Sequence, residues 1–132
     1  VSSYPIGSGD GVRVGDVTFL QNGFSGTTTW LRSCGSGVQA NGRAAITQVT
    51  LPSNTDVAMF KIYSRSNAKS DGDFLEHGDF IELENRKAGE LRWLEVYGAS
   101  QQSGGYGVEL SPTRTRATPT NVWRVLLESD GA

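Results

Sequence analysis

The stretch GDGVRVGDVTFLQN (residues 9–22) recurs as GDFLEHGDFIELEN (residues 72–85), 63 positions further along the chain. Both copies open with Gly-Asp, four residues and a second Gly-Asp, and both close with Leu-x-Asn. At the same offset, residues 9–66 align with residues 72–129 without a gap and share 15 identities in 58 positions. Average residue usage would give roughly a third of that number by chance. The sequence therefore contains an internal duplication, which decides how the fold is assembled.

The positions shared by the two repeats are mostly those that make turns and core. Each repeat carries a Trp-Leu pair and closes on an aromatic, a basic and an aliphatic residue. The pairs are Trp30-Leu31 and Trp93-Leu94, and the closing trios are Phe60-Lys61-Ile62 and Trp123-Arg124-Val125. Gly and Asp suit tight turns, because Gly adopts positive φ at little cost and Asp accepts a nearby backbone N–H. The repeat therefore describes the scaffold, and we expect ligand contacts where the copies differ.

Length and charge indicate a single domain and exclude several kinds of partner. We expect one domain over residues 1–132, built of repeats 9–66 and 72–129, because this length is enough for a substantial core. A net charge of −2 with both signs scattered argues against a nucleic-acid partner. No apolar run approaches the roughly 20 residues that a membrane span needs, and Cys34 has no second cysteine to pair with.

The start of the chain bears on its origin. It opens with Val1 and lacks an initiator Met and a signal-like apolar segment. We therefore expect that a Met or a longer leader was removed, which slightly favours a secreted protein over a cytoplasmic one.

Eight short segments have the composition of β-strands, and no segment has a sustained helical period. The segments are residues 17–21, 28–33, 44–51, 57–64, 80–84, 91–97, 106–110 and 121–127. In residues 80–84, glutamates alternate with Ile81 and Leu83, which predicts a half-buried strand whose carboxylates lie on a solvated face. Residues 112–119 run between two prolines and predict an exposed loop or edge. The fold class is all-β.

The order of elements within each repeat resembles the repeat unit of β-trefoil proteins, in particular the MIR and fascin-like groups. The residues that carry the resemblance are Gly15-Asp16 to Asn22, Trp30-Leu31, Gln48-Val49-Thr50 and Phe60-Lys61-Ile62, with Gly78-Asp79 to Asn85, Trp93-Leu94 and Trp123-Arg124-Val125. The resemblance implies a β-trefoil-like fold. Because a trefoil has three units and this sequence shows two, a two-fold β-sandwich of similar sheets is the alternative.

Neither a catalytic pair nor a metal site stands out in the sequence. Cys34 and His77 are the sole Cys and the sole His, and neither aligns with its own kind in the other repeat. A glycosidase or a hard cation would use clustered carboxylates, but only two in the second repeat align with a carboxylate in the first. The cluster is Asp71, Asp73, Glu76, Asp79, Glu82 and Glu84. Because no hydrolase signature is present, we expect a non-enzymatic protein without metal or cofactor.

Polar and aromatic residues in Gly-rich loops favour a carbohydrate-binding protein, a lectin with one shallow site per repeat. Amides and carboxylates match sugar hydroxyls, an aromatic ring packs on the C–H side of a sugar, and two sites give avidity. Asn is also favoured at hairpins for local geometry alone. The candidate ligand-binding residues are Asp10, Asn22, Gln39, Asn41, Arg43, Asp73, Asn85, Tyr97, Gln102 and Tyr106.

Two other functions stay open on the sequence alone. A protein-interaction or inhibitor module would use Ser64-Arg65-Ser66 and Thr113-Arg114-Thr115-Arg116 as contact surfaces, because Arg is enriched at interfaces. A hydrolase using the second-repeat carboxylates is the third option. Two-unit β proteins also leave sheet edges to be covered, which predicts a homodimer.

Overall fold

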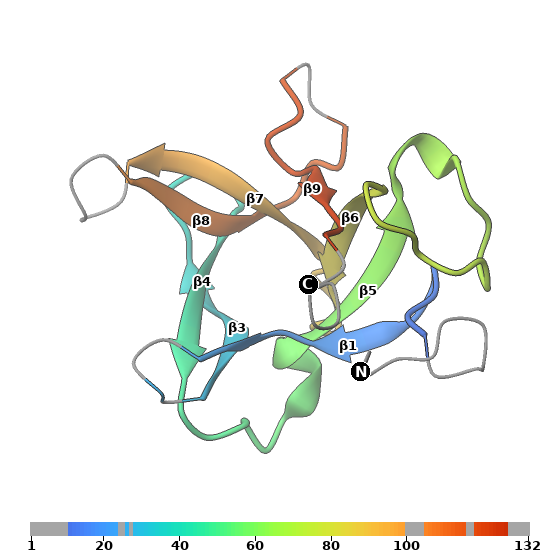
Figure 1. Cartoon of the computed structure of the whole chain (residues 1–132). Coiled ribbons are helices and arrows are strands. Elements are labelled where there is room, and N and C mark those ends of the chain that lie inside the picture. Colours follow the sequence, from blue (N-terminus) through green and yellow to red (C-terminus); the bar gives the residue numbers. More distant parts are fainter. Residues whose placement is uncertain (1–10, 24–25, 27, 100–104, 116–117, 127–132) are drawn as a thin grey trace.

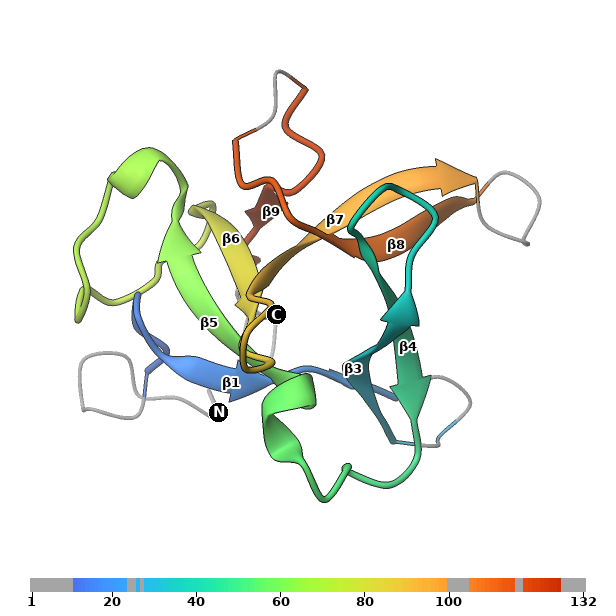
Figure 2. The same cartoon turned by 180° about the vertical axis from the view of Figure 1, so that it is seen from behind.

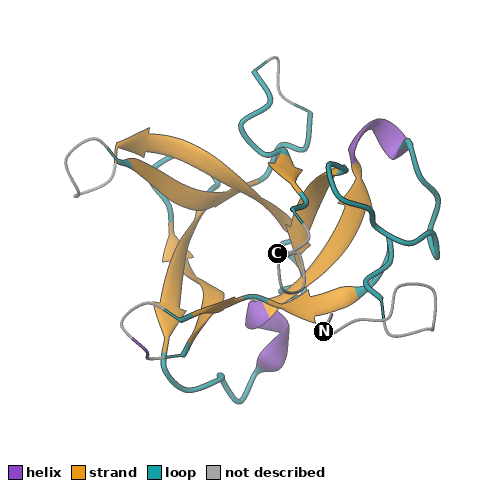
Figure 3. Ribbon diagram, in the orientation of Figure 1, coloured by secondary structure: helices purple, strands orange, loops and turns teal. Residues whose placement is uncertain are grey.

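The computed structural model of the chain describes residues 11–23, 26, 28–99, 105–115 and 118–126. The described residues form nine strands and two short 3₁₀ turns, with no α-helix among them, so the all-β prediction is confirmed (Figures 1 and 3). The strands are β1 (Val17–Phe19), β2 (Gln21–Asn22), β3 (Thr29–Ser36), β4 (Arg43–Gln48), β5 (Met59–Ser64), β6 (Phe80–Asn85), β7 (Arg92–Ala99), β8 (Tyr106–Ser111) and β9 (Trp123–Arg124), and the 3₁₀ turns are η2 (Thr55–Ala58) and η3 (Arg65–Asn67).

All nine strands belong to one antiparallel sheet that is nearly closed. The strand order is β1-β5-β6-β7-β8-β4-β3-β2, and β9 pairs with β6 outside this path. Only Leu20 separates β1 from β2, so the two ends of the sheet are successive parts of one chain segment. Figures 1 and 2 show the strands arranged around a common centre.

Each of the eight predicted segments overlaps at least one strand, although most of the ends differ. The first is interrupted at Leu20, whose carbonyl accepts the backbone N–H of Leu31 at 2.9 Å. Val57 and Ala58 lie in η2, so β5 begins two residues later than expected. The last segment contributes only Trp123–Arg124 as a strand among its described residues.

Corresponding elements of the two halves lie 63 residues apart. Strands β3 and β7 have the same length, and so do β4 and β8. The pairing of β3 shifts its register between Ser33 and Ser36, and the pairing of β7 shifts between Val96 and Ala99. The irregularities therefore fall at the same positions in both halves.

The repeated Gly-Asp turns have the same geometry in both halves. Gly15 and Gly78 have φ values of 92° and 94°, which a Cβ would make unfavourable. The N–H of Gly15 donates to the carbonyl of Ile62 at 2.8 Å, and that of Gly78 to the carbonyl of Val125 at 2.7 Å. The following Asp side chain accepts a backbone N–H three residues earlier at 2.8 Å in each half. These turns tie the start of each half to the aromatic-basic-aliphatic trio that closes it, at Ile62 and Val125.

The inner face of the sheet forms the hydrophobic core. Cross-strand neighbours such as Ile62 and Leu83, or Leu94 and Leu110, point to this face together. Burying each such side chain contributes roughly 1.5–3 kcal/mol to folding. The buried cluster consists of Val14, Phe60, Ile62, Leu75, Ile81, Leu83, Leu94 and Leu110.

The outer face of β6, β7 and β8 carries four buried carboxylates. Glu82 and Glu84 come from β6, whereas Glu95 and Glu109 lie directly opposite each other on β7 and β8. These four residues are between 0 and 8% exposed. Because β6 is buried on both faces from Ile81 to Asn85, the prediction of a half-buried strand with solvated carboxylates is wrong.

Loops from both halves cover these carboxylates. The backbone N–H groups of Val38 and Gln39 donate to the two oxygens of Glu109, at 2.9 and 3.0 Å. Gln39 Nε2 donates to Glu95 Oε1 at 2.6 Å, and Thr120 Oγ1 donates to Glu95 Oε2 at 3.0 Å. A buried carboxylate is tolerated only when donors satisfy its oxygens. The alternation of charged and apolar residues predicts the two faces of β6, but not the contacts that bury its carboxylates, such as the bond from Arg114 Nε to Glu82 Oε1 at 2.9 Å.

The loop between β3 and β4 approaches the sheet closely at Gly37. A Cβ at this position would lie 2.8 Å from Glu109 Oε1 and 3.1 Å from the carbonyl carbon of Arg43. Since Glu109 Oε1 also accepts the N–H of Gln39, making room for the Cβ would disturb a hydrogen bond to a buried charge.

We expect the substitution Gly37→Ala to lower the free energy of unfolding by about 1–3 kcal/mol, because a methyl group is forced into a packed site. The measurement is urea denaturation at neutral pH. The control is Gly23→Ala, where the Cβ would meet nothing within 4 Å and the change should stay within about 0.5 kcal/mol. Equal midpoints for the two variants would contradict the close approach.

Candidate functional site

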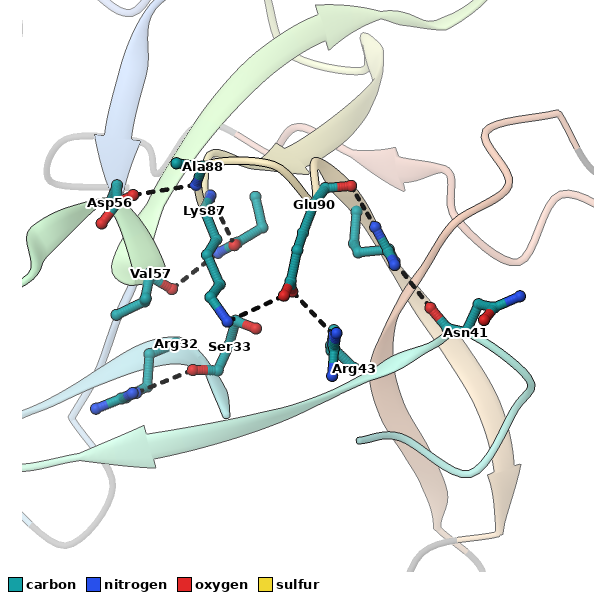
Figure 4. Close-up of polar contacts among 11 residues, drawn as sticks. Arg32, Ser33, Asn41, Arg43, Asp56, Val57, Lys87, Ala88 and Glu90 are labelled. Atoms are coloured by element: carbon teal, nitrogen blue, oxygen red, sulfur yellow. Dashed lines mark hydrogen bonds and ion pairs between the residues drawn. The ribbon is translucent and has the colours of Figure 1, made fainter. Parts of the chain in front are cut away.

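The predicted residues of the first repeat make contacts within the fold. Asn41 accepts a hydrogen bond from Arg92 Nε through its backbone carbonyl at 2.8 Å, and Arg43 Nε lies 2.9 Å from Glu90 Oε1 (Figure 4). Desolvation opposes ionisation of Glu90, but Lys87 and the nearby arginines hold its pKa below the ordinary value. Together with the bond from Gln39 to Glu95, these contacts attach the β3–β4 loop to the second half.

Asn85 and its counterpart Asn22 have different surroundings. Asn85 is 1% exposed; its Nδ2 donates to the carbonyl of Val57 at 2.9 Å, and its Oδ1 accepts the N–H of Lys87 at 3.2 Å. Asn22 is exposed, and its backbone carbonyl accepts a bond from Thr29 Oγ1 at 3.3 Å. The amide of Asn85 therefore holds η2 and the turn after β6 in place.

We expect Asn85→Ala to lower the free energy of unfolding by about 1–3 kcal/mol, because it leaves a buried carbonyl and a backbone N–H without their partner. Asn22→Ala is the matched control at the corresponding exposed position and should change stability by less than about 0.5 kcal/mol. Thermal and urea unfolding measure both. A large loss for Asn22→Ala together with a small loss for Asn85→Ala would contradict these roles.

The other predicted residues do not gather at one place. Asp73 is exposed, and its carboxylate accepts the N–H of Ser70 at 2.9 Å, as expected for a turn residue. Tyr97 and Tyr106 are exposed on β7 and β8, and Tyr106 is 75% exposed. Asp10 and Gln102 lie outside the described residues. None of the described candidates lines either of the two hollows below.

A hollow of about 250 Å³, which we call the polar hollow, lies between η3, β6 and the loop before β9. The expected loop of residues 112–119 provides part of its wall, in the portion that the structure describes. Most lining side chains are charged or polar. The lining residues are Arg65, Ser66, Asn67, Glu82, Arg114, Thr115, Pro119, Asn121 and Val122.

Several contacts fix the side chain of Arg114, which lines the polar hollow. Its Nε lies 2.9 Å from Glu82 Oε1, and its Nη2 lies 3.5 Å from Asn67 Oδ1. The guanidinium also lies over the rings of Tyr63 and Trp93, 4.9 Å from each centroid. An ion pair and two cation–π contacts thus hold one side chain, and each such contact adds stabilisation. The rings in turn meet edge to face at 5.1 Å.

The wall of the polar hollow that η3 forms contains two residues with positive φ. Ser66 and Asn67 have φ values of 55° and 52°, in the left-handed region that residues other than Gly seldom adopt. Such conformations cost free energy and cluster at functional sites. The hydroxyl of Ser64 accepts the N–H of Lys69 at 3.0 Å, which closes this turn. The turn therefore presents Arg65 and Asn67 to the hollow.

A second hollow of about 300 Å³, which we call the lysine hollow, adjoins η3. Its lining residues are Ser64, Arg65, Ala68, Lys69, Gly78, Asp79 and Phe80. Lys69 Nζ lies 2.7 Å from both Asp79 Oδ2 and Glu76 Oε1. The hydrogen bond to Asp79 is the main reason that the pKa of Lys69 is raised, and the same bond lowers the pKa of Asp79. Lys69 is thus neutralised within the fold.

Asp79→Asn should lower the melting temperature at pH 7 by roughly 1–3 °C more than Asp16→Asn does. Asp16→Asn is the matched control. Asp16 accepts the backbone N–H of Arg13 just as Asp79 accepts that of Glu76, but Asp16 forms no ion pair among the described residues. Since the folded pKa of Asp79 lies below the unfolded value near 4, its stabilisation is present above pH ~4 and is lost as the pH falls through the folded pKa.

Differential scanning calorimetry between pH 7 and pH 2 measures this effect. The excess loss in Asp79→Asn should shrink toward zero at the acid end. An excess that stays constant with pH would show that the ion pair with Lys69 contributes nothing.

Sequence reasoning did not identify the polar hollow as a site. The segments around Arg65 and Arg114 were expected as contact surfaces, but nothing in the sequence indicates that they border one hollow. The one indication of this site in the sequence is that the two repeats differ at its lining residues. Leu51 aligns with Arg114, and Phe19 aligns with Glu82.

Comparisons with known proteins bear on the fold alone. No family model matches the sequence, and no curated protein does. The structure is similar to that of a Caenorhabditis elegans protein of unknown function, with a TM-score of 0.69 and 20% identity, over 93% of this chain and 68% of the other. At this identity the likeness shows a shared fold.

The described residues offer neither a cluster of metal ligands nor a membrane-spanning helix. Among the described residues, no three His, Cys, Asp or Glu side chains lie close enough together to hold a metal ion. The part of the chain that the structure describes also contains no helix with the length and apolar character needed to span a membrane.

Proposed function

We propose that this protein is a non-catalytic carbohydrate-binding protein and that its ligand binds in the polar hollow. The observation that supports this is the composition of the hollow walls. Arg65 supplies donors, the amide of Asn67 supplies both donors and an acceptor, and Glu82 supplies acceptors. Sugar hydroxyls both donate and accept hydrogen bonds, so a mixed wall of this kind suits them. A volume of about 250 Å³ lies just below the usual range of ligand pockets and suits a small unit.

The proposed site belongs to one half of the molecule. The positions that correspond to Arg114 and Glu82 carry Leu51 and Phe19, which cannot form the same ion pair. We therefore replace the expectation of one site per repeat by a proposal of a single site, at the junction of η3 and the second half.

We also propose that the fold is a β-trefoil-like architecture of two units produced by duplication. The support is the recurrence of strands, register shifts and Gly-Asp turns at an interval of 63 residues. All nine strands belong to one sheet, and this favours the β-trefoil-like architecture over a two-fold sandwich of separate sheets.

The test of the proposed function is glycan-array screening followed by calorimetric titration of the best glycan. Asn67→Gly removes the amide but permits the left-handed backbone, and it should weaken binding about tenfold, equivalent to one hydrogen bond. Asn41→Gly is the matched control, because Asn41 is also exposed and left-handed, with φ of 61°, but lies in the β3–β4 loop. It should change affinity by less than about twofold.

Two results would reject this assignment. The first is the absence of any bound glycan at millimolar concentration. The second is a larger loss of affinity for Asn41→Gly than for Asn67→Gly, which would place the site in the loop expected from the sequence.

A protein-interaction module is the second candidate, and one observation favours it. The two arginine-bearing segments expected to form contact surfaces both border the polar hollow, through Arg65 and Arg114. A protein partner with a carboxylate side chain would suit the same surface. A macromolecule retained by the wild-type protein but not by Asn67→Gly, with no glycan binding, would favour this function over the first.

A further inference from the structure

Arg65 stands between the two hollows and lines both of them. It is exposed, and none of the described carboxylates forms an ion pair with it. The other two cations in the hollow walls are neutralised within the fold, Arg114 by Glu82 and Lys69 by Asp79. Arg65 is therefore the one cation lining the two hollows that none of the described carboxylates pairs with, and it lies at their common border.

The two hollows differ in chemistry. The polar hollow has amide, carboxylate and guanidinium groups in its wall. The lysine hollow is bordered by Ala68, Gly78 and the ring of Phe80, which is 50% exposed. An exposed aromatic ring is the surface that the C–H side of a sugar requires. Because Val17 occupies the corresponding position in the first half, this feature also belongs to one half only.

Resting on the proposed function, we propose that the ligand is an acidic oligosaccharide of at least two units that spans both hollows. One unit hydrogen-bonds in the polar hollow, the next packs on Phe80, and a carboxylate or sulfate group lies against the guanidinium of Arg65. A guanidinium binds such planar or tetrahedral anions through two parallel N–H groups, and these charge-assisted bonds are about twice as strong as neutral ones.

The experiment uses an array of uronic-acid and sulfated oligosaccharides together with their methyl-esterified and desulfated forms. The best binder and its uncharged form are then titrated against the wild-type protein. We expect the charged form to bind about ten- to a hundredfold more tightly. In Arg65→Gln this preference should fall to within about twofold.

A matched control tests whether any loss of positive charge has the same effect. Arg32→Gln removes an arginine on β3 that hydrogen-bonds Gln48 at 2.9 Å and lines neither hollow. This variant should keep the full preference for the charged form. An equal loss in both variants would overturn the assignment to Arg65.

The span of the ligand is tested with Phe80→Ala. The affinity for the disaccharide should fall about three- to tenfold, as expected for loss of an aromatic contact, and that for the monosaccharide should change less than twofold. Equal effects on both would overturn the two-unit span. Equal affinities of the wild-type protein for charged and uncharged forms would overturn the acidic ligand but leave the proposed function intact. If no glycan of either kind binds, the proposed function itself fails.

Discussion

Burial of four carboxylates on the outer face of β6, β7 and β8 constrains the second half of the structure. An ionised carboxylate without hydrogen-bond donors costs several kcal/mol when it is removed from water. Each covering segment therefore supplies a donor, such as the N–H of Gln39 for Glu109, the hydroxyl of Thr120 for Glu95 and the guanidinium of Arg114 for Glu82. The polar hollow lies beside the last of these contacts, where the loop before β9 meets η3.

The corresponding strands of the first half carry different residues on their outer face. At the positions of Glu82 and Glu109 stand Phe19 and Ile46, and Phe19 packs edge to face on Trp30 at 5.7 Å between ring centroids. Ile46 is 40% exposed. Turns and core are thus common to both halves, whereas the outer face of each half follows from its own residues. Strands that recur in both halves thus carry outer faces of different composition.

Local patterns in the sequence predict the strands well, because alternation and turn residues act over a few positions. Gly78 and Asp79 are examples, since their turn depends on one glycine and one nearby N–H. The burial of Glu95 and Asn85 could not be predicted in this way, because their partners Gln39 and Val57 are distant in sequence. The polar hollow could not be predicted for the same reason, since Arg65 and Arg114 come from segments that only the complete sheet brings together.

The two arginines of the polar hollow differ in how strongly the fold itself restrains them. Arg114 is already ordered by Glu82, Tyr63 and Trp93, so its position costs a ligand little conformational entropy. Arg65 has no such restraint among the described residues and loses rotamer freedom, about 1–2 kcal/mol, when a ligand orders it. A bidentate ion pair between the guanidinium and an anionic group offsets that cost with a larger surplus than a single hydrogen bond to a neutral hydroxyl does. A neutral ligand would therefore gain mainly from the ordered wall, and an anionic one from both walls.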